Sequence, residues 1–266
     1  MLAYKKTSLI HLLPEGQLVN RHWLYKKGFS RSDIDYYIRS GHLHAVYRGL
    51  YRKPGKPLKW QHLLYSLQEM GFPVHLGGKS ALAEKGLLHY LEFGEREIQL
   101  FSPQILPKWL TNWHQDYQSS FFFSTYRKSW LQNLPANLIM ELPFGGWDWP
   151  IHIAQPELAI IEWISEAKTI EDLQEIDAVF DGLTILSPAK VQTALQHCPS
   201  ILTRRLFGWF CDQYSHPWIK RIDWQKIDLG KGKRTFIKGG VFNKKWKITV
   251  PQTLGGEEFE SKQPLF

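Results

Sequence analysis

Residues 29–55 read FSRSDIDYYIRSGHLHAVYRGLYRKPG, and the order of patterns within them decides the fold of the first part of the chain. Ser30 and Asp33 have the spacing of a capping box, in which each side chain accepts a hydrogen bond from the other residue's backbone N–H. Gly41 suits the position just past the end of a helix. The stretch therefore predicts a helix that begins at Ser30 and stops at Gly41.

A hairpin is predicted directly after this helix, because two short strands at about 43–47 and 50–53 flank a tight Arg-Gly turn. Upstream, Asn20 can cap a shorter helix over residues 21–27. Helix, tight turn, helix and hairpin follow one another in a winged helix-turn-helix. In that fold the second helix enters the major groove and the hairpin, or wing, lies along the DNA.

The second helix has one apolar face and one polar face. Ile34, Tyr37 and Ile38 share the apolar face and would pack on the small domain. The side chains expected to reach DNA are Arg31, Ser32, Tyr36 and Arg39 on the helix, and Arg48, Arg52 and Lys53 on the wing. Base-edge contacts set sequence preference, whereas phosphate contacts set position and affinity. We expect the helix to read bases and the wing to meet phosphates.

Two wing tyrosines, Tyr47 and Tyr51, each stand directly before an arginine. One of them is expected to fill the core of the small domain, and the other could donate a hydrogen bond to a phosphate. The strand alternation does not distinguish the two.

The remainder of the chain shows strand patterns first and helix patterns later. A linking helix is expected within residues 57–71. Strands are expected within residues 73–76, 97–102, 120–126, 138–144 and 149–154, and helices within residues 79–91, 156–166, 171–183, 187–198 and 200–214. The fold class is predicted to be α+β. The predicted parts are a winged helix-turn-helix domain with its linking helix at 1–72, a larger mixed α/β domain at 73–251, and an extended or frayed tail at 252–266.

The positive charge lies in two blocks that flank an acidic body. Residues 1–56 hold eleven Lys/Arg against three Asp/Glu, and residues 218–247 hold ten against two, so each block carries +8. Residues 57–217 hold eleven against seventeen, a net charge of −6. Two basic blocks favour a polyanionic partner.

The second block combines glycine-containing turns, lysines and spaced aromatic residues. Its predicted basic face consists of Lys231, Lys233, Arg234, Lys244 and Lys245. Basic residues with aromatics between them suit nucleic acid, although a sheet that packs its aromatics inward has the same pattern. Both interpretations stay open for Trp224, Phe236, Phe242 and Trp246.

No catalytic or metal-binding pattern is complete. GGKS at residues 77–80 lacks the first glycine of a phosphate-binding loop, because Pro73 occupies that position. Glu95 and Glu97 precede Gln99, where a metal-dependent nuclease needs a lysine. The eleven histidines include no HExxH motif. The sequence therefore predicts no enzyme, no metal site and no cofactor.

The cellular compartment is predicted from cysteines and hydropathy. The two cysteines form no CxxC motif, and no apolar run approaches the ~20 residues that span a bilayer. The first residues lack the continuous apolar region of a signal peptide. We expect a cytoplasmic protein with no membrane partner.

Several stretches resemble the AbiEi-type antitoxins of bacterial type IV toxin–antitoxin and phage abortive-infection systems. They are SGHLHAVYRGLYRKPG (40–55), VHLGGKSALAEKGLLHYL (74–91), TRRLFGWFCD (203–212) and DLGKGKRTFIKGGVFNKKWKITVP (228–251). The likeness runs from about residue 17 to residue 251, and the closing stretch is its most specific part.

This resemblance implies a repressor that binds inverted repeats in its own promoter. It also implies an antitoxin that counteracts a cognate nucleotidyltransferase-type toxin without forming a stable complex, and it supplies no catalytic residues. The residues alone leave two other functions open. One is a nucleic-acid-processing enzyme targeted by the winged helix, and the other is a transcription factor whose second domain senses a small ligand.

Overall fold

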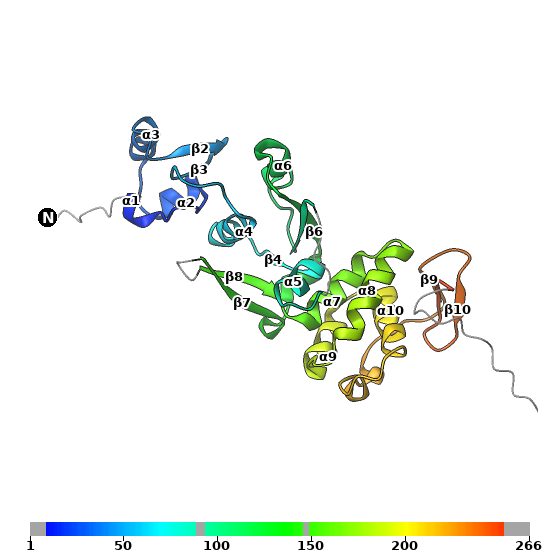
Figure 1. Cartoon of the computed structure of the whole chain (residues 1–266). Helices are drawn as coiled ribbons and strands as arrows, with labels where there is room; N and C mark the ends of the chain where they lie inside the picture. Colours follow the sequence, from blue (N-terminus) through cyan, green and yellow to red (C-terminus); the bar gives the residue numbers. More distant parts are fainter. Residues whose placement is uncertain (1–8, 89–93, 146–148, 253–266) are drawn as a thin grey trace, which may run out of the picture. The chain divides into compact units, whose positions relative to one another are not determined.

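The chain is divided between two units, as the computed structural model shows (Figure 1). The structure describes residues 9–88, 94–145 and 149–252. Unit 1 takes in residues 1–76, 92–132 and 140–153, and unit 2 takes in residues 77–91, 133–139 and 154–266. Both units combine helices with strands, which confirms the predicted α+β class. The boundary between residues 72 and 73 stays a prediction, and nearly all of the predicted tail, residues 253–266, lies outside the described residues.

The winged helix-turn-helix forms the first part of unit 1 (Figure 1). Its helices are α1 (Leu9–Leu12), α2 (Arg21–Lys26) and α3 (Arg31–Arg39), and its strands are β1 (Val19–Asn20), β2 (His44–Tyr47) and β3 (Leu50–Arg52). Strand β3 lies between β1 and β2 and pairs antiparallel with both. Strand β1 was not predicted, and it gives the wing sheet its third strand.

Local hydrogen bonds hold α3 in the predicted place. Ser30 Oγ accepts from the Asp33 backbone N–H at 3.2 Å, and Asp33 Oδ2 accepts from the Ser30 N–H at 2.7 Å. Gly28 and Gly41 have positive φ, so the chain can reverse after α2 and after α3. Ile34 is fully buried beneath the helix, which confirms the predicted apolar face.

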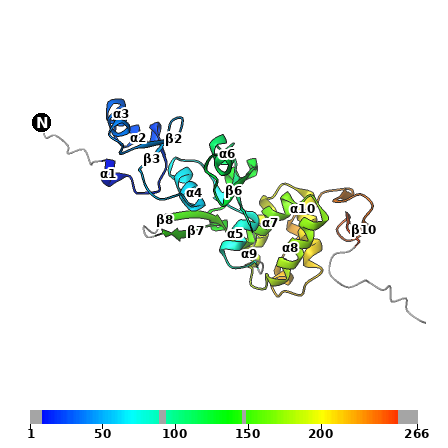
Figure 2. The same cartoon turned by 45° about the horizontal axis from the view of Figure 1, so that its top comes forward.

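A five-stranded sheet makes up most of the rest of unit 1. Its strands are β4 (His75–Leu76), β5 (Arg96–Ser102), β6 (Phe121–Arg127), β7 (Ile139–Phe144) and β8 (Trp149–Ala154), in the order β6-β5-β4-β8-β7. Helix α4 (Trp60–Glu69) lies beside β8 in both views (Figures 1 and 2), and Tyr65 stacks on Trp149 at 4.4 Å. Helix α6 (Lys108–Tyr117) connects the parallel strands β5 and β6 and was not predicted.

Unit 2 is mainly helical. Its helices are α5 (Gly78–Glu84), α7 (Pro156–Glu166), α8 (Ile170–Gly182), α9 (Pro188–His197) and α10 (Ile201–Cys211). Helix α7 contacts the other four, and its residues 157–164 are all buried. Residues 156–166 therefore carry apolar side chains around most of the helix, as a surrounded helix requires.

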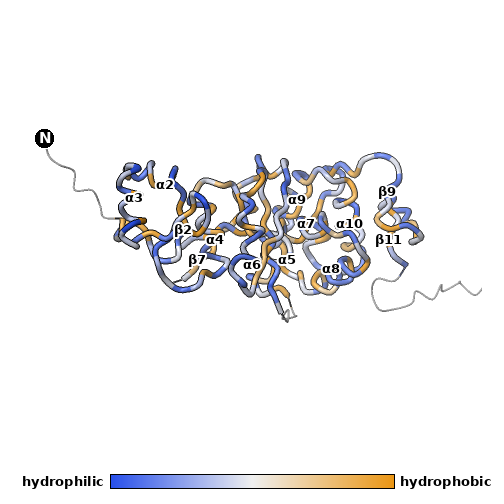
Figure 3. The backbone as a smooth tube through the Cα atoms, turned by 90° about the horizontal axis from the view of Figure 1, so that it is seen from above, coloured by the Kyte–Doolittle hydropathy of each residue, from blue (hydrophilic) through white to orange (hydrophobic). Residues whose placement is uncertain are grey.

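The last part of unit 2 is a small three-stranded sheet with short helices before it. Its strands are β9 (Arg234–Thr235), β10 (Val241–Asn243) and β11 (Ile248–Val250), with β11 in the middle. Two short 3-10 helices, η4 (Ile219–Arg221) and η5 (Trp224–Lys226), precede this sheet. Two others lie earlier in the chain, η1 (Ser129–Asn133) and η2 (Ala136–Leu138). The hydropathy colouring in Figure 3 shows hydrophilic turns next to β9 and a hydrophobic β11. Among the helices that the structure describes, none is long and apolar enough to cross a membrane.

Candidate nucleic-acid interface

The outward face of α3 presents the four side chains predicted to reach base edges. Arg31, Ser32, Tyr36 and Arg39 are all exposed, and Tyr36 retains 60% of its accessible surface. A helix that keeps an aromatic ring and two guanidinium groups in solvent, above a buried isoleucine, presents a surface free for a ligand. The structure thus brings the predicted helix residues together on one face, and DNA contact by them stays a prediction.

Asp35 is an acidic group at the centre of this face, and it is not among the residues predicted to contact DNA. Arg21 Nη2 meets Asp35 Oδ1 at 3.2 Å, and Arg31 Nε lies 3.9 Å from Asp35 Oδ2. These two cations offset the carboxylate that would otherwise repel phosphate. The Arg31 side chain is still 81% exposed, so its contact with Asp35 leaves it accessible.

Arg39 lies in the last turn of α3, and only the Nε atom of its guanidinium forms a hydrogen bond within the described residues. Its Nε donates to the Asp35 carbonyl oxygen at 3.3 Å. Within the described residues no other hydrogen bond of this side chain is formed, so both Nη groups face solvent. A guanidinium with free Nη groups has the fork that binds the O6 and N7 atoms of guanine.

The wing places Arg48 at its turn, beside Gly49 with φ +78. The Arg48 side chain is exposed, and in the described parts of the chain it has no hydrogen bond or ion pair. The register of β2 and β3 shifts between Ala45 and Tyr47, which marks an irregularity just before this turn. Arg48 therefore has the position and freedom that a phosphate contact requires.

Arg48→Ala is expected to weaken binding to every DNA sequence by the same factor. One lost phosphate contact should lower the salt slope of log K by about 0.9. Fluorescence anisotropy on promoter and scrambled duplexes at several salt concentrations measures both quantities. A changed sequence preference with an unchanged slope would contradict the assignment.

Arg52 is arranged differently from Arg48. Its Nε donates to the Lys53 carbonyl at 3.0 Å, and its Nη2 donates to the Gly55 and Lys56 carbonyls at 2.7 Å each. Burial lowers the pKa of this guanidinium. Arg52 thus fixes the loop after β3. Lys53 is half-buried. DNA contact by Arg52 and by Lys53 stays a prediction.

The two wing tyrosines have separate structural roles. Tyr51 is buried, and its hydroxyl accepts a hydrogen bond from Arg21 Nε at 2.9 Å. Tyr47 is half-buried, and its ring packs on Trp109 and Trp113 of α6. The Tyr47 hydroxyl donates to Asp116, so this side chain fastens the wing to α6.

The second basic face rests on a buried arginine in α10. Arg205 is 1% exposed, and its guanidinium donates to the carbonyls of Leu229, Gly230, Gly232 and Lys247 at 2.7 to 3.0 Å. Four carbonyls on one guanidinium fix the glycine-rich turn that carries Lys231 and Lys233. The neighbouring Arg204 binds the Asp228 carbonyl at 2.6 Å in the same way. This anchoring of the turn was not predicted, although two adjacent arginines within a mostly apolar helix are a sequence pattern that indicates buried guanidinium contacts.

The five cations of the predicted second basic face are all exposed, but the aromatic residues beside them differ in burial. Lys231, Lys233, Arg234, Lys244 and Lys245 are exposed. Trp246 is buried, and its indole N–H donates to Asp212 at 2.7 Å. Phe242 is 36% exposed, and the Lys233 ammonium lies 4.9 Å from its ring centre. The inward-packing interpretation thus holds for Trp246, whereas Phe242 stays on the surface beside a cation.

The GGKS segment is arranged as a structural turn. Gly78 begins α5, and its backbone N–H donates to Glu162 Oε2 at 3.1 Å. Glu162 is fully buried, so a carboxylate already occupies the place at which a phosphate-binding loop would hold its anion. Across the described ranges, no three His, Cys, Asp or Glu side chains gather in a group that could hold a metal ion.

Comparison with known proteins gives matches along the whole chain. A family model described as the AbiEi antitoxin N-terminal domain of a transcriptional regulator matches residues 3–93. A second model, described as a transcriptional regulator, AbiEi antitoxin of a type IV toxin–antitoxin system, matches residues 95–251. No curated protein matches the chain.

A solved structure shares the fold. The crystal structure of the RV2827C protein from Mycobacterium tuberculosis aligns with a TM-score of 0.52 over 87% of this chain and 85% of that one, at 15% sequence identity. At this identity the likeness supports the fold alone. The two family models together account for nearly every residue of the sequence, and both bear the same family description. The protein therefore belongs to the AbiEi antitoxin family of type IV toxin–antitoxin transcriptional regulators.

Proposed function

We propose that this protein represses its own toxin–antitoxin promoter by binding inverted repeats, and that it counteracts a cognate nucleotidyltransferase-type toxin without a stable complex. Membership of the AbiEi family supports a DNA-binding regulator and antitoxin. The observation that carries the DNA-binding part is the exposed polar face of α3, with Arg48 at the turn of the adjoining wing. Binding to the promoter would take place in the cytoplasm.

The two basic surfaces differ in what they offer to DNA. Helix α3 can place Arg31, Ser32, Tyr36 and Arg39 against base edges, which is the kind of contact that distinguishes sequences. The second basic face carries its cations on turns and short strands, a form suited to phosphates without sequence preference. We assign sequence recognition to α3 and additional backbone affinity to the second face.

We also propose that neither unit is catalytic and that the protein needs no cofactor. The phosphate-loop candidate at residues 77–80 is filled by Glu162. The Gln99 side-chain amide donates a hydrogen bond from Nε2 to Glu97 Oε2 at 3.1 Å. One oxygen of the carboxylate in the nuclease-like pattern is therefore already hydrogen-bonded. A nuclease and nucleotidyl-transfer assay with Mg²⁺ or Mn²⁺ on DNA and RNA is expected to show no turnover, and turnover would favour the enzymatic alternative.

The functional test uses the full chain, because a fragment that ends at residue 72 would lose the α6 side chains around Tyr47. Arg39→Ala/Arg48→Ala is expected to abolish repression of a promoter fusion while still protecting cells that express the toxin. Mixing toxin and antitoxin on a sizing column is expected to give two separate peaks. If the double variant lost protection but kept repression, the assignment of promoter binding to Arg39 and Arg48 would be wrong. If toxin and antitoxin co-eluted, neutralisation without a stable complex would be wrong.

A further inference from the structure

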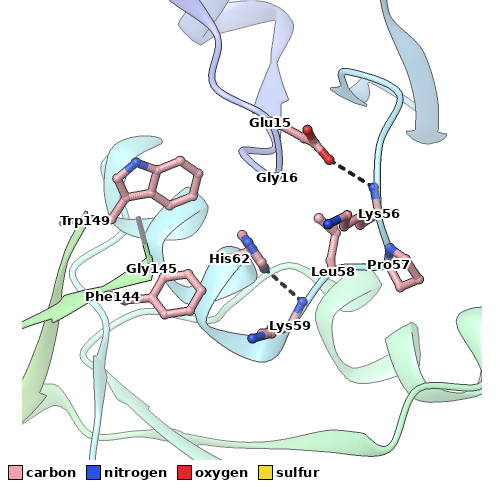
Figure 4. A pocket seen from close by; sticks show the side chains of 10 residues that line it. All are labelled: Glu15, Gly16, Lys56, Pro57, Leu58, Lys59, His62, Phe144, Gly145 and Trp149. Carbon is pink, nitrogen blue, oxygen red and sulfur yellow. Dashed lines mark hydrogen bonds between the residues drawn. The ribbon is translucent and has the colours of Figure 1, made fainter. Parts of the chain in front are cut away.

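A cavity of about 290 Å³ lies in unit 1 at the amino-terminal end of α4 (Figure 4). Three segments line it. They contribute Glu15 and Gly16 before β1, Lys56, Pro57, Leu58, Lys59 and His62 around the start of α4, and Phe144 and Gly145 at the end of β7 with Trp149 of β8. Ligand cavities in proteins have volumes of about 300–1,000 Å³, so this one is at the small end of that range.

One side of the cavity is aromatic. His62 meets Phe144 edge to face at 4.9 Å between ring centres, and it meets Trp149 edge to face at 5.8 Å. Trp149 is buried, and its stacking on Tyr65 fixes the plane of the indole. Figure 4 shows Phe144 and Trp149 on the side of the cavity opposite Lys56 and Pro57. Rigid aromatic walls favour a flat ring as the ligand.

Two lysines also line the cavity, Lys56 on the side opposite Phe144 and Lys59 near His62 at the start of α4 (Figure 4). Lys56 and Lys59 are both exposed, and within the described residues neither ammonium group has a hydrogen bond or an ion pair. The carboxylate of Glu15 accepts a hydrogen bond from the Lys56 backbone N–H at 3.1 Å. Two lysines against one carboxylate leave the cavity positive. The N-terminal end of α4, which begins directly after Lys59, adds partial positive charge.

His62, between the two sides, is a hydrogen-bond donor of fixed tautomer. Its Nδ1 accepts from the Lys59 backbone N–H at 2.9 Å, which places the ring proton on Nε2. Burial lowers the pKa of His62, which favours the neutral imidazole. Gly16 has φ +95, and a side chain there would lie 2.5 Å from the His62 ring, so only glycine lets the chain pass.

We propose that this cavity binds a small anion that carries a planar aromatic ring, with the size and chemistry of a nucleoside monophosphate. The ring would pack against Phe144 and His62, and the anion would lie on Lys56 and Lys59. The inference goes beyond the proposed function, because neither promoter binding nor protection from a toxin requires a small ligand.

Isothermal titration of the full-length protein with AMP, CMP, GMP and UMP tests the proposal. At least one nucleotide is expected to bind at one site per chain, and at least tenfold more tightly than adenosine or inorganic phosphate alone. Lys56→Gln/Lys59→Gln is expected to weaken that binding at least tenfold, and Phe144→Leu to weaken it as well. Lys108→Gln removes an exposed lysine of unit 1 outside the cavity and should leave the affinity unchanged.

Each other outcome overturns the proposal. Three outcomes do so: none of the four nucleotides binds, phosphate alone binds as tightly as the nucleotides, or the double lysine variant keeps its affinity for the nucleotide. Arg48→Gln is a second control, since an equal loss there would place the nucleotide on the DNA surface. If Phe144→Leu fails to fold, the lysine variants carry the test. Promoter affinity is measured on the same samples, so failure of DNA binding with intact nucleotide binding would refute only the proposed function.

Discussion

Arg205→Ala is expected to lower the free energy of unfolding by about 3–5 kcal/mol, because it removes a buried guanidinium that donates to four carbonyls, and a hydrogen bond to a charged group contributes about 1.5–3 kcal/mol. Arg205 is 1% exposed, and its guanidinium donates to the carbonyls of residues 229, 230, 232 and 247. Urea denaturation followed by tryptophan fluorescence measures the loss.

Two further variants complete this experiment. Arg205→Lys keeps the charge but replaces a planar fork with one compact ammonium, so it should recover only part of the lost stability. Arg221→Ala removes an exposed arginine of the same unit and should change stability by no more than about 0.5 kcal/mol. If Arg205→Ala were as stable as Arg221→Ala, the carbonyl contacts would not hold the turn in solution.

Arg39→Ala is expected to reduce the preference for the promoter over scrambled DNA by about 1–3 kcal/mol, which is roughly 5- to 150-fold in the ratio of the two dissociation constants. The reason is geometric: Nε is engaged by the Asp35 carbonyl, while both Nη groups are presented to solvent. Anisotropy titrations on both duplexes at one salt concentration give the ratio.

The matched control is Arg127→Ala, which removes an exposed arginine of unit 1 at the end of β6. It should change neither affinity nor preference. An equal loss on promoter and scrambled DNA from Arg39→Ala would make Arg39 a phosphate contact, and base reading by this side chain would then be wrong.

The sequence predicted those parts of the fold that depend on short-range signals. The capping box of Ser30 and Asp33 placed α3, and the pattern of residues 156–166 placed α7 with the bounds that the structure has. These signals lie within one element, so a single sequence contains them whole. Spacing on α3 also identified which side chains would be exposed.

The parts that were missed depend on contacts between distant segments. β1 has two residues and exists only because Val19 and Asn20 pair with Tyr51 and Leu50. α6 did carry a signal, since Trp109, Trp113 and Tyr117 recur every four residues, but their packing partner Tyr47 lies more than sixty residues earlier. The carbonyl contacts of Arg205 reach across residues 229 to 247, and a sequence shows the arginine without its acceptors.

The division of unit 1 into three stretches has a consequence for synthesis on the ribosome. The wing is translated well before α6, and α4 is translated well before Trp149, on which Tyr65 stacks. At about 5–20 residues per second, residue 153 follows residue 76 by roughly 4–15 s. At the start of that interval the nascent chain already contains α3 but lacks both α6, which supports the wing, and Trp149, on which Tyr65 of α4 stacks. Helix α4 would thus gain its stacking partner Trp149 only after more than half of the protein has been made.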